Sequence, residues 1–233
     1  MFDKQRLKWV LNSTLGLLLA FAFVLLLQWL LLLTGKTVSH FQGQIQWNGF
    51  DFHITARYWN FYQVMALYLF PELVFVLLFI FFPWRPKFPV KTPEILQLFL
   101  GWAGLILLVK TFFIPFADVF CHRNLFFALS WSGFSRPFQY GIVIMAMILF
   151  LINIFAVSAV FSPLLPSFAD LSPGKKLLQL LFLWYLPFGI WAGCIYFFSG
   201  NHFFYPVNFL LIGMGLVLMV NTPYMMSYRV IVR

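Results

Sequence analysis

Two ionisable side chains lie inside long apolar runs of the sequence. Glu72 follows Pro71 near the middle of the run 61–83, and Lys110 lies in the outer half of the run 94–116. With a helical rise of about 1.5 Å per residue, Glu72 would lie about 16 Å and Lys110 about 9 Å below the outer ends of their helices. A lysine side chain is long enough to bridge that offset and to pair with the carboxylate.

Charged groups are costly in hydrocarbon, so such a pair calls for an explanation. The functional explanation is a proton or ion relay, or the polar lining of a substrate path. The structural explanation, which is favoured, is a pair that locks two helices together, or a Lys110 that extends to the outer interface. Asn153 is a further polar candidate within the spans, and hydrogen bonds between helices explain it together with Gln28 and Asn221.

A second group of candidates lies on the predicted outer side. Asp118 and His122 are four residues apart, so a helix would place them on one face, with Arg123 beside them. Such a group could act on a lipid. The sequence contains no H-E-x-x-H zinc motif, no glycine-rich phosphate loop and no C-x-x-C pair, so no catalytic residue is identified.

The histidines and cysteines do not form a recognisable ligand pattern. No histidine lies within a span, which argues against haem inside the bundle. The sequence therefore predicts neither a metal site nor a cofactor. A disulfide between Cys121 and Cys194 is an option if the outer side is oxidising, although two unpaired cysteines are expected. All four histidines fall on the predicted outer side without the spacing of metal ligands: His40, His53, His122 and His202.

The composition identifies the class of protein. Of the 233 residues, 63% are hydrophobic and 9% are charged, and the mean hydropathy is +0.91. A soluble domain needs more charge than this to cover its surface. The net charge of +9 does not indicate a nucleic-acid partner, because the basic residues lie at the ends of apolar runs, where they contact headgroups. We therefore expect an all-α integral membrane protein with a single transmembrane domain over residues 1–233.

Six apolar runs are long enough to cross a hydrocarbon core, which takes about 20 helical residues. Helices are required there because each backbone amide must find its partner within its own segment. The first run is too long for a secretory signal, and no cleavage site follows it, so it is expected to remain as a span. The predicted spans lie near 11–34, 61–83, 94–116, 138–162, 176–199 and 205–228.

The distribution of lysine and arginine predicts the orientation. With the N-terminus inside, ten of these residues lie on the cytoplasmic side and four on the outer side. Both termini are therefore predicted to be cytoplasmic, with the chain in the cell membrane. The inner residues are Lys4, Arg6, Lys8, Arg85, Lys87, Lys91, Lys175, Lys176, Arg229 and Arg233, and the outer ones are Lys36, Arg57, Arg123 and Arg136.

Two short elements are expected on the outer side. Residues 44–54 alternate apolar and polar positions about Asn48-Gly49, which predicts a β-hairpin with a two-residue turn that pairs Trp47 with Phe50 and Ile45 with Phe52. Residues 118–131 predict an interfacial helix that Asp118 caps.

Small residues recur on the last two spans. Gly189 and Gly193 form a G-x-x-x-G pair on the fifth, and Gly213 and Gly215 lie close together on the sixth. Such spacings let helices approach closely. They indicate either packing within the bundle or a surface for a partner helix.

The layout resembles that of ABC-2-type permeases in its six spans, two cytoplasmic termini, basic N-terminal segment and inner connection between spans two and three. The resemblance implies that the connection, around 83–94, docks an ATPase. This segment is rich in proline, unlike a coupling helix, and the connection 200–204 leaves little room for re-entrant helices.

The absence of a soluble domain and of a reaction centre favours a membrane subunit that works with partners. The leading hypothesis is a transport or permease-type component in contact with membrane lipids and with partner subunits or further copies of itself. The alternatives are a structural subunit of a larger membrane complex and a small intramembrane enzyme that acts on a lipid.

Overall fold

The computed structural model describes residues 4–40, 43–46, 49–52, 59–84, 93–161, 171–198 and 207–227. Its elements, with π-helical segments labelled η, are in chain order α1 (Lys4–Ser39), β1 (Gly43–Gln46), β2 (Gly49–Phe52), α2 (Phe61–Val64), η2 (Met65–Leu69), α3 (Phe70–Phe81), α4 (Glu94–Leu108), η3 (Val109–Phe113), α5 (Ile114–Phe120), α6 (Asn124–Trp131), α7 (Arg136–Asn153), α8 (Ala156–Phe161), α9 (Pro173–Leu180), η6 (Leu181–Tyr185), α10 (Leu186–Phe198) and α11 (Val207–Ser227).

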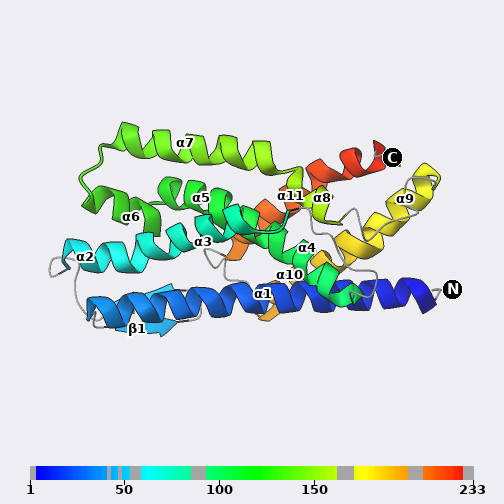
Figure 1. Cartoon of the computed structure of the whole chain (residues 1–233), viewed down its shortest axis with the longest axis horizontal. Helices are drawn as coiled ribbons and strands as arrows, with labels where there is room; N and C mark the ends of the chain where they lie inside the picture. Colours follow the sequence, from blue (N-terminus) through cyan, green and yellow to red (C-terminus); the bar gives the residue numbers. More distant parts are fainter. Residues whose placement is uncertain are drawn as a thin grey trace.

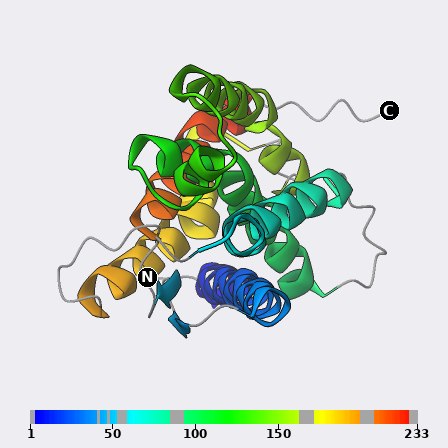
Figure 2. The ribbon, with the colours of Figure 1, turned by 90° about the vertical axis from the view of Figure 1, so that its left-hand side faces the viewer.

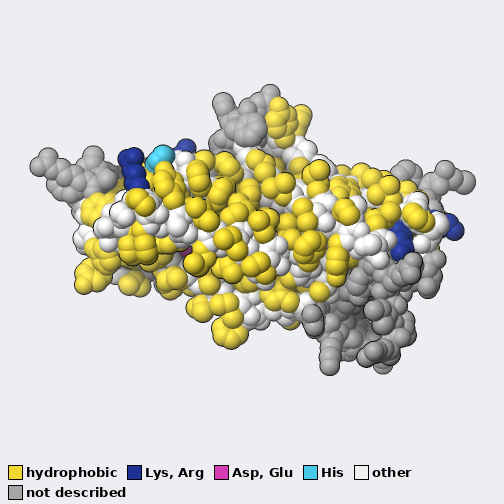
Figure 3. All heavy atoms as spheres, turned by 90° about the horizontal axis from the view of Figure 1, so that it is seen from above, with side chains coloured by type: hydrophobic (Ala, Val, Ile, Leu, Met, Phe, Trp, Pro, Cys, Tyr) yellow, Lys and Arg dark blue, Asp and Glu magenta, His cyan; other side chains and the backbone are white. Residues whose placement is uncertain are grey.

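The helices combine into six spans that are long and apolar enough to cross a membrane, which confirms the predicted number. Figure 1 shows the described ends of the chain, in α1 and α11, at the same end of an elongated bundle, as an even number of crossings requires. On the face drawn in Figure 3, apolar side chains cover the middle, and lysine and arginine lie toward the two ends. The spans are Leu7–Ser39, Phe61–Phe81, Glu94–Phe120, Arg136–Phe161, Pro173–Phe197 and Val207–Ser227.

The third span is the core of the molecule. Over an 18-residue stretch of this span 89% of the residues are buried, compared with 28–33% in the other spans. Its segments α4, η3 and α5 pack against α1, α3, α7, α8 and α11. Close approach is necessary at Gly213 of α11, where a Cβ atom would lie 2.5 Å from Cγ1 of Val109 in η3. Helices of the first, second, fourth and sixth spans therefore enclose this one helix.

Three of the spans contain a five-residue π-helical segment that ends two residues before a proline. They are η2 before Pro71, η3 before Pro115 and η6 before Pro187. In each, the residue that precedes the proline donates its N–H to the carbonyl five residues back. Proline has no N–H to donate, and its ring clashes with the carbonyl four residues back in an α-helix. A wider turn relieves that clash, so the prolines determine where these segments lie.

Strands β1 and β2 form an antiparallel pair in the stretch where the sequence predicts a hairpin, and Figure 2 shows them beside α1. The predicted register is wrong, because Ile45 lies opposite Phe50 instead of Phe52. The two registers differ by two residues, and a pattern that repeats every two residues is the same in both. The parts of the predicted hairpin that lie outside the described residues are 47–48 and 53–54.

The predicted outer helix 118–131 is wrong in its first turn. α5 continues the third span as far as Phe120, and α6 begins only at Asn124. Between them His122 has a φ of 53°, in the left-handed region that interrupts a right-handed helix. Asp118 consequently lies at the end of the third span and not at the start of α6.

Candidate functional site

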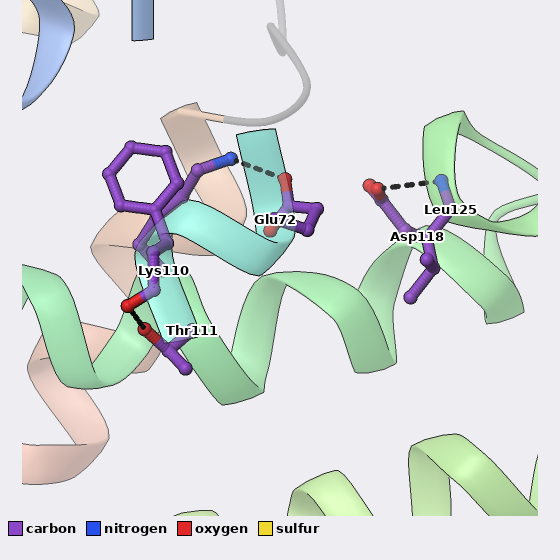
Figure 4. A network of polar contacts seen from close by, with 6 residues as sticks. Glu72, Lys110, Thr111, Asp118 and Leu125 are labelled. Carbon is purple, nitrogen blue, oxygen red and sulfur yellow. Dashed lines mark hydrogen bonds and ion pairs between the residues drawn. The ribbon is translucent and has the colours of Figure 1, made fainter. Parts of the chain in front are cut away.

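The central span places Lys110 in the interior of the bundle. Lys110 belongs to η3, whose five residues are all buried. Its ammonium nitrogen lies 3.1 Å from Oε1 of Glu72 and 5.2 Å from the centre of the Phe75 ring. Both partners belong to α3, and Figure 4 shows the ion pair between the two helices. The structure thus brings together the two intramembrane charges that the sequence singles out.

The ion pair is nearly shielded from the surroundings of the bundle. The side chains of Lys110 and Glu72 are 10% and 13% exposed, respectively. Beside them, the hydroxyl of Thr111 donates to the carbonyl oxygen of Phe75 at 3.2 Å. Two polar contacts therefore join η3 to α3. They lie close to the π segments η2 and η3, each of which precedes a proline.

Asp118 adds a second carboxylate to this region. It is 1% exposed, and its Oδ2 accepts the backbone N–H of Leu125 at 3.1 Å, which caps the start of α6. In the view of Figure 4 its carboxylate lies on the side of Glu72 away from Lys110, and the charges of Glu72, Lys110 and Arg123 act on it. Among the described atoms, Oδ1 of Asp118 and Oε2 of Glu72 have no hydrogen-bond donor. We refer to Glu72, Lys110 and Asp118 as the buried charge cluster.

A small cavity adjoins Lys110. It has a volume of about 40 Å³ and lies between α1, the third span and α11. Gln28 and Lys110 are its polar lining residues. This volume is sufficient for a water molecule. Gln28, which the sequence identifies only as a polar residue within a span, therefore lines the same cavity as Lys110.

The remaining predicted candidates do not join the cluster. The prediction that Asn153 bonds between helices is wrong, because its side chain donates to the carbonyl of Leu149 in its own helix at 2.8 Å. His122 and Arg123 are exposed, and the ring of His122 packs edge-on against Phe126. The prediction that Asp118 and His122 share one helix face is wrong, because α5 ends before His122 is reached.

A buried polar network at Ser13 is missed by the sequence analysis. The Ser13 hydroxyl donates to the carbonyl oxygen of Leu183 at 2.5 Å and accepts from Nε1 of Trp102 at 3.0 Å. Leu183 lies four residues before Pro187, so its carbonyl is the one that an α-helix would pair with the N–H that proline lacks. Pro187 in the sequence indicates that the Leu183 carbonyl lacks its usual helical partner. The hydroxyl that bonds to this carbonyl comes from Ser13, which is far away in the sequence.

A second network surrounds Asn221, which is 0% exposed. Its amide nitrogen donates to the carbonyls of Ile154 and Val217, and its amide oxygen accepts from the hydroxyl of Ser158. Ile154 lies where α7 gives way to α8. The side chain thus joins α11 to that break, and the predicted interhelical hydrogen bonding of Asn221 is confirmed.

Neither a metal site nor a disulfide is formed by the part of the chain that the structure describes. No three histidine, cysteine, aspartate or glutamate side chains within it lie close enough together to hold a metal ion. Cys121 and Cys194 are both free and exposed. His53 and His202 lie outside the described residues.

The chain was also compared with known proteins. No protein-family model, curated protein or solved structure matches it. Most of the connection between spans two and three, for which the sequence predicts ATPase docking, lies outside the described residues, at 85–92. The function therefore has to be inferred from the buried charge cluster and the helices that hold it.

Proposed function

We propose that this protein is a membrane transport component of the permease type, in which the central span carries the groups that respond to the transported solute. The observation behind the proposal is the Lys110–Glu72 ion pair, at 3.1 Å, which joins the buried third span to the second span inside the bundle. Polar groups at this depth, within a bundle that has almost no soluble mass, are what a path across the membrane requires.

The energetics favour a use for the charges beyond holding helices together. Removing two charged groups from water costs several kcal/mol per ion, and their attraction often does no more than offset that cost. Two apolar side chains of similar size would join spans two and three at least as well. A pair that gives so little net stability is better explained by what its charges do.

The backbone beside the pair supports movement. Lys110 lies within η3, and Glu72 follows η2 by three residues. A π segment differs from an α-helix by one residue in its hydrogen-bond register, and such segments occur frequently at functional sites. A change of register in η3 would rotate Lys110 relative to Glu72. The charged pair and the adaptable backbone therefore coincide in both helices.

The proposal can be tested by recording charge movement. The protein is extracted in mild detergent with whatever partners co-purify, reconstituted into liposomes on a solid support, and exposed to concentration jumps of small ions, amino acids and sugars at constant pH. We expect a current with one solute class, lost in Glu72→Gln. Asn153→Leu is the matched control and should retain the current, because the side-chain bond that Asn153 makes among the described residues lies within its own helix. An unchanged current in correctly assembled Glu72→Gln protein would contradict the proposal.

A second candidate function, a structural subunit of a larger membrane complex, is favoured by one feature of α10. Gly189 and Gly193 are both exposed, and a Cβ atom on either would meet no described atom within 4 Å. Such a face allows a partner helix to approach closely. Cys194 is exposed beside it, so oxidative cross-linking in native membranes should join Cys194 to a partner subunit or a second copy. Recovery of uncross-linked chain alone would argue against this function.

A further inference from the structure

Two carboxylate oxygens of the buried charge cluster are left without a partner. Glu72 uses Oε1 to pair with Lys110, and Asp118 uses Oδ2 to accept the N–H of Leu125. The second oxygen of each, Oε2 and Oδ1 respectively, is buried and has no donor among the described residues. Buried polar atoms are nearly always paired, so each exception requires an explanation.

The buried charge cluster has more acidic than basic groups. Two acids and one base share the interior, and Lys110 is already held by Glu72 and the face of the Phe75 ring. Arg123 also acts on Asp118, but it is exposed, so its charge is screened by the surroundings of the bundle. With both acids ionised, the buried groups would carry an excess negative charge, which hydrocarbon strongly disfavours.

We propose that Asp118 and Glu72 form a proton-binding site that holds one exchangeable proton, resident on Asp118 while Glu72 pairs with Lys110. The inference rests on the proposed transport function and names its coupling ion. When Asp118 releases the proton and Glu72 takes it up, one O–H bond breaks at Oδ1 of Asp118 and one O–H bond forms at Oε2 of Glu72. Lys110 then faces a neutral Glu72, and its charge, which also acts on Asp118, compensates that of ionised Asp118, so the total charge is unchanged.

A proton fits this site better than a metal ion does. The Lys110 ammonium lies 3.1 Å from Glu72 and repels a second cation. The described residues also offer no third histidine, cysteine, aspartate or glutamate for coordination. A proton needs only one oxygen that is free to bind it, and both acids provide one.

Proton transfer would also reach α6. The Leu125 N–H binds a charged carboxylate more strongly than a neutral acid, so loss of the proton from Asp118 should tighten the cap. α6 in turn packs on η2, where Tyr68 contacts Phe127 and the Ser132 hydroxyl donates to the sulfur of Met65 at 3.6 Å.

Other titratable groups belong to the turn after α5 and to the elements that pack near Asp118. Apart from Glu72 and Lys110, they are Cys121, His122, Arg123, Tyr68, Arg136, Tyr140 and Tyr224.

The site can be tested with a membrane-soluble carbodiimide on the full chain in nanodiscs. Such a reagent takes the proton of a carboxylic acid onto its own nitrogen, and the carboxyl oxygen adds to its central carbon, so only protonated acids react. Peptide mapping at neutral pH should find the adduct on Asp118, with labelling that falls roughly tenfold per pH unit once the proton is lost. Glu94, which lies beside Lys8 near the end of the bundle, is the internal control and should remain unlabelled.

Infrared spectroscopy provides a second measurement that does not depend on access of the reagent. The wild-type protein should show the C=O stretching band of a protonated acid at neutral pH, and Asp118→Asn should lose it. Absence of both the adduct and the band at neutral pH would overturn the inference. Neither measurement involves transport, so a proton site without solute currents would refute only the proposed function, whereas currents without a protonated acid would refute only the proton site.

Discussion

Lys110, Glu72 and Ser13 are polar residues whose partners come from other spans. Lys110 and Glu72 neutralise each other between the second and third spans. The Ser13 hydroxyl donates to the Leu183 carbonyl and accepts from the Trp102 indole N–H. These groups are buried, so the cost of removing one partner includes the desolvation of the other. Mutations at these positions should therefore show strong coupling.

The ion pair is expected to behave as a unit in stability measurements. Lys110→Met or Glu72→Met alone leaves an uncompensated buried charge and should lower the free energy of unfolding by about 3 kcal/mol. The double substitution removes both charges and should recover most of that loss. Thermal unfolding in detergent measures the cycle. Single effects that simply add in the double variant would show that the two side chains are not coupled.

The Ser13 network predicts a large effect for a small change. Ser13→Ala leaves the Leu183 carbonyl and the Trp102 indole N–H unpaired and should cost about 2 kcal/mol of stability. Thr34→Ala is the matched control, since the Thr34 hydroxyl bonds only to Leu30 in its own helix, at an exposed position. That variant should change stability by less than about 0.5 kcal/mol. Equal effects of the two changes would contradict the assignment.

At the scale of elements, proline decides the geometry of three spans. Pro71, Pro115 and Pro187 each follow a π segment by the same interval, because the missing N–H and the ring clash act at fixed positions upstream. The consequence differs between spans. In the fifth span a carbonyl is paired by α1, whereas in the second and third the π segments lie beside charged groups.

A double-mutant cycle can test the link between Pro187 and Ser13. In Pro187→Ala the new N–H is available to the Leu183 carbonyl, so the cost of Ser13→Ala should fall by about 1 kcal/mol in that background. Pro173→Ala is the control, because a proline at the start of α9 replaces no helical hydrogen bond. There the cost of Ser13→Ala should be unchanged. An unaltered cost in the Pro187→Ala background would disprove the link.

At the scale of the whole molecule, the third span is enclosed by helices of four other spans. The third span is buried over most of its length, and the surrounding helices expose apolar faces. This arrangement makes the same residue type behave differently at different sites. Gly213 has Val109 and Phe113 against it, whereas Gly189 has no described neighbour within reach of a Cβ atom.

This difference gives a matched prediction for two glycines in neighbouring helices. Gly213→Ala should lower the free energy of unfolding by about 1–3 kcal/mol, because the methyl group overlaps η3. Gly189→Ala should leave it unchanged or raise it by up to about 1 kcal/mol, because alanine favours the helix and nothing obstructs it. Thermal unfolding and the yield of monodisperse protein measure both. Loss of stability at Gly189 instead would mean that a partner remains bound there during purification.

The sequence by itself determined the membrane-spanning architecture, since only helices of about 20 apolar residues satisfy their backbone in hydrocarbon. It also singled out Glu72 and Lys110, because charge inside an apolar run is visible without a structure, and their spacing along two spans allowed them to meet. The positions of the prolines in the sequence likewise determine where the π segments lie. These features depend on local composition or on the geometry of a single helix.

Only the tertiary structure decided which span is central and which polar groups meet. Apolar residues in a membrane are alike toward lipid and toward other helices, so hydropathy does not distinguish the enclosed third span from its neighbours. Asp118 was placed in the wrong helix because a left-handed φ at His122 ended α5, and its proximity to Glu72 followed from that placement. The contacts of Ser13 with Leu183 and of Ser158 with Asn221 join residues far apart in the chain, so packing alone brings them together.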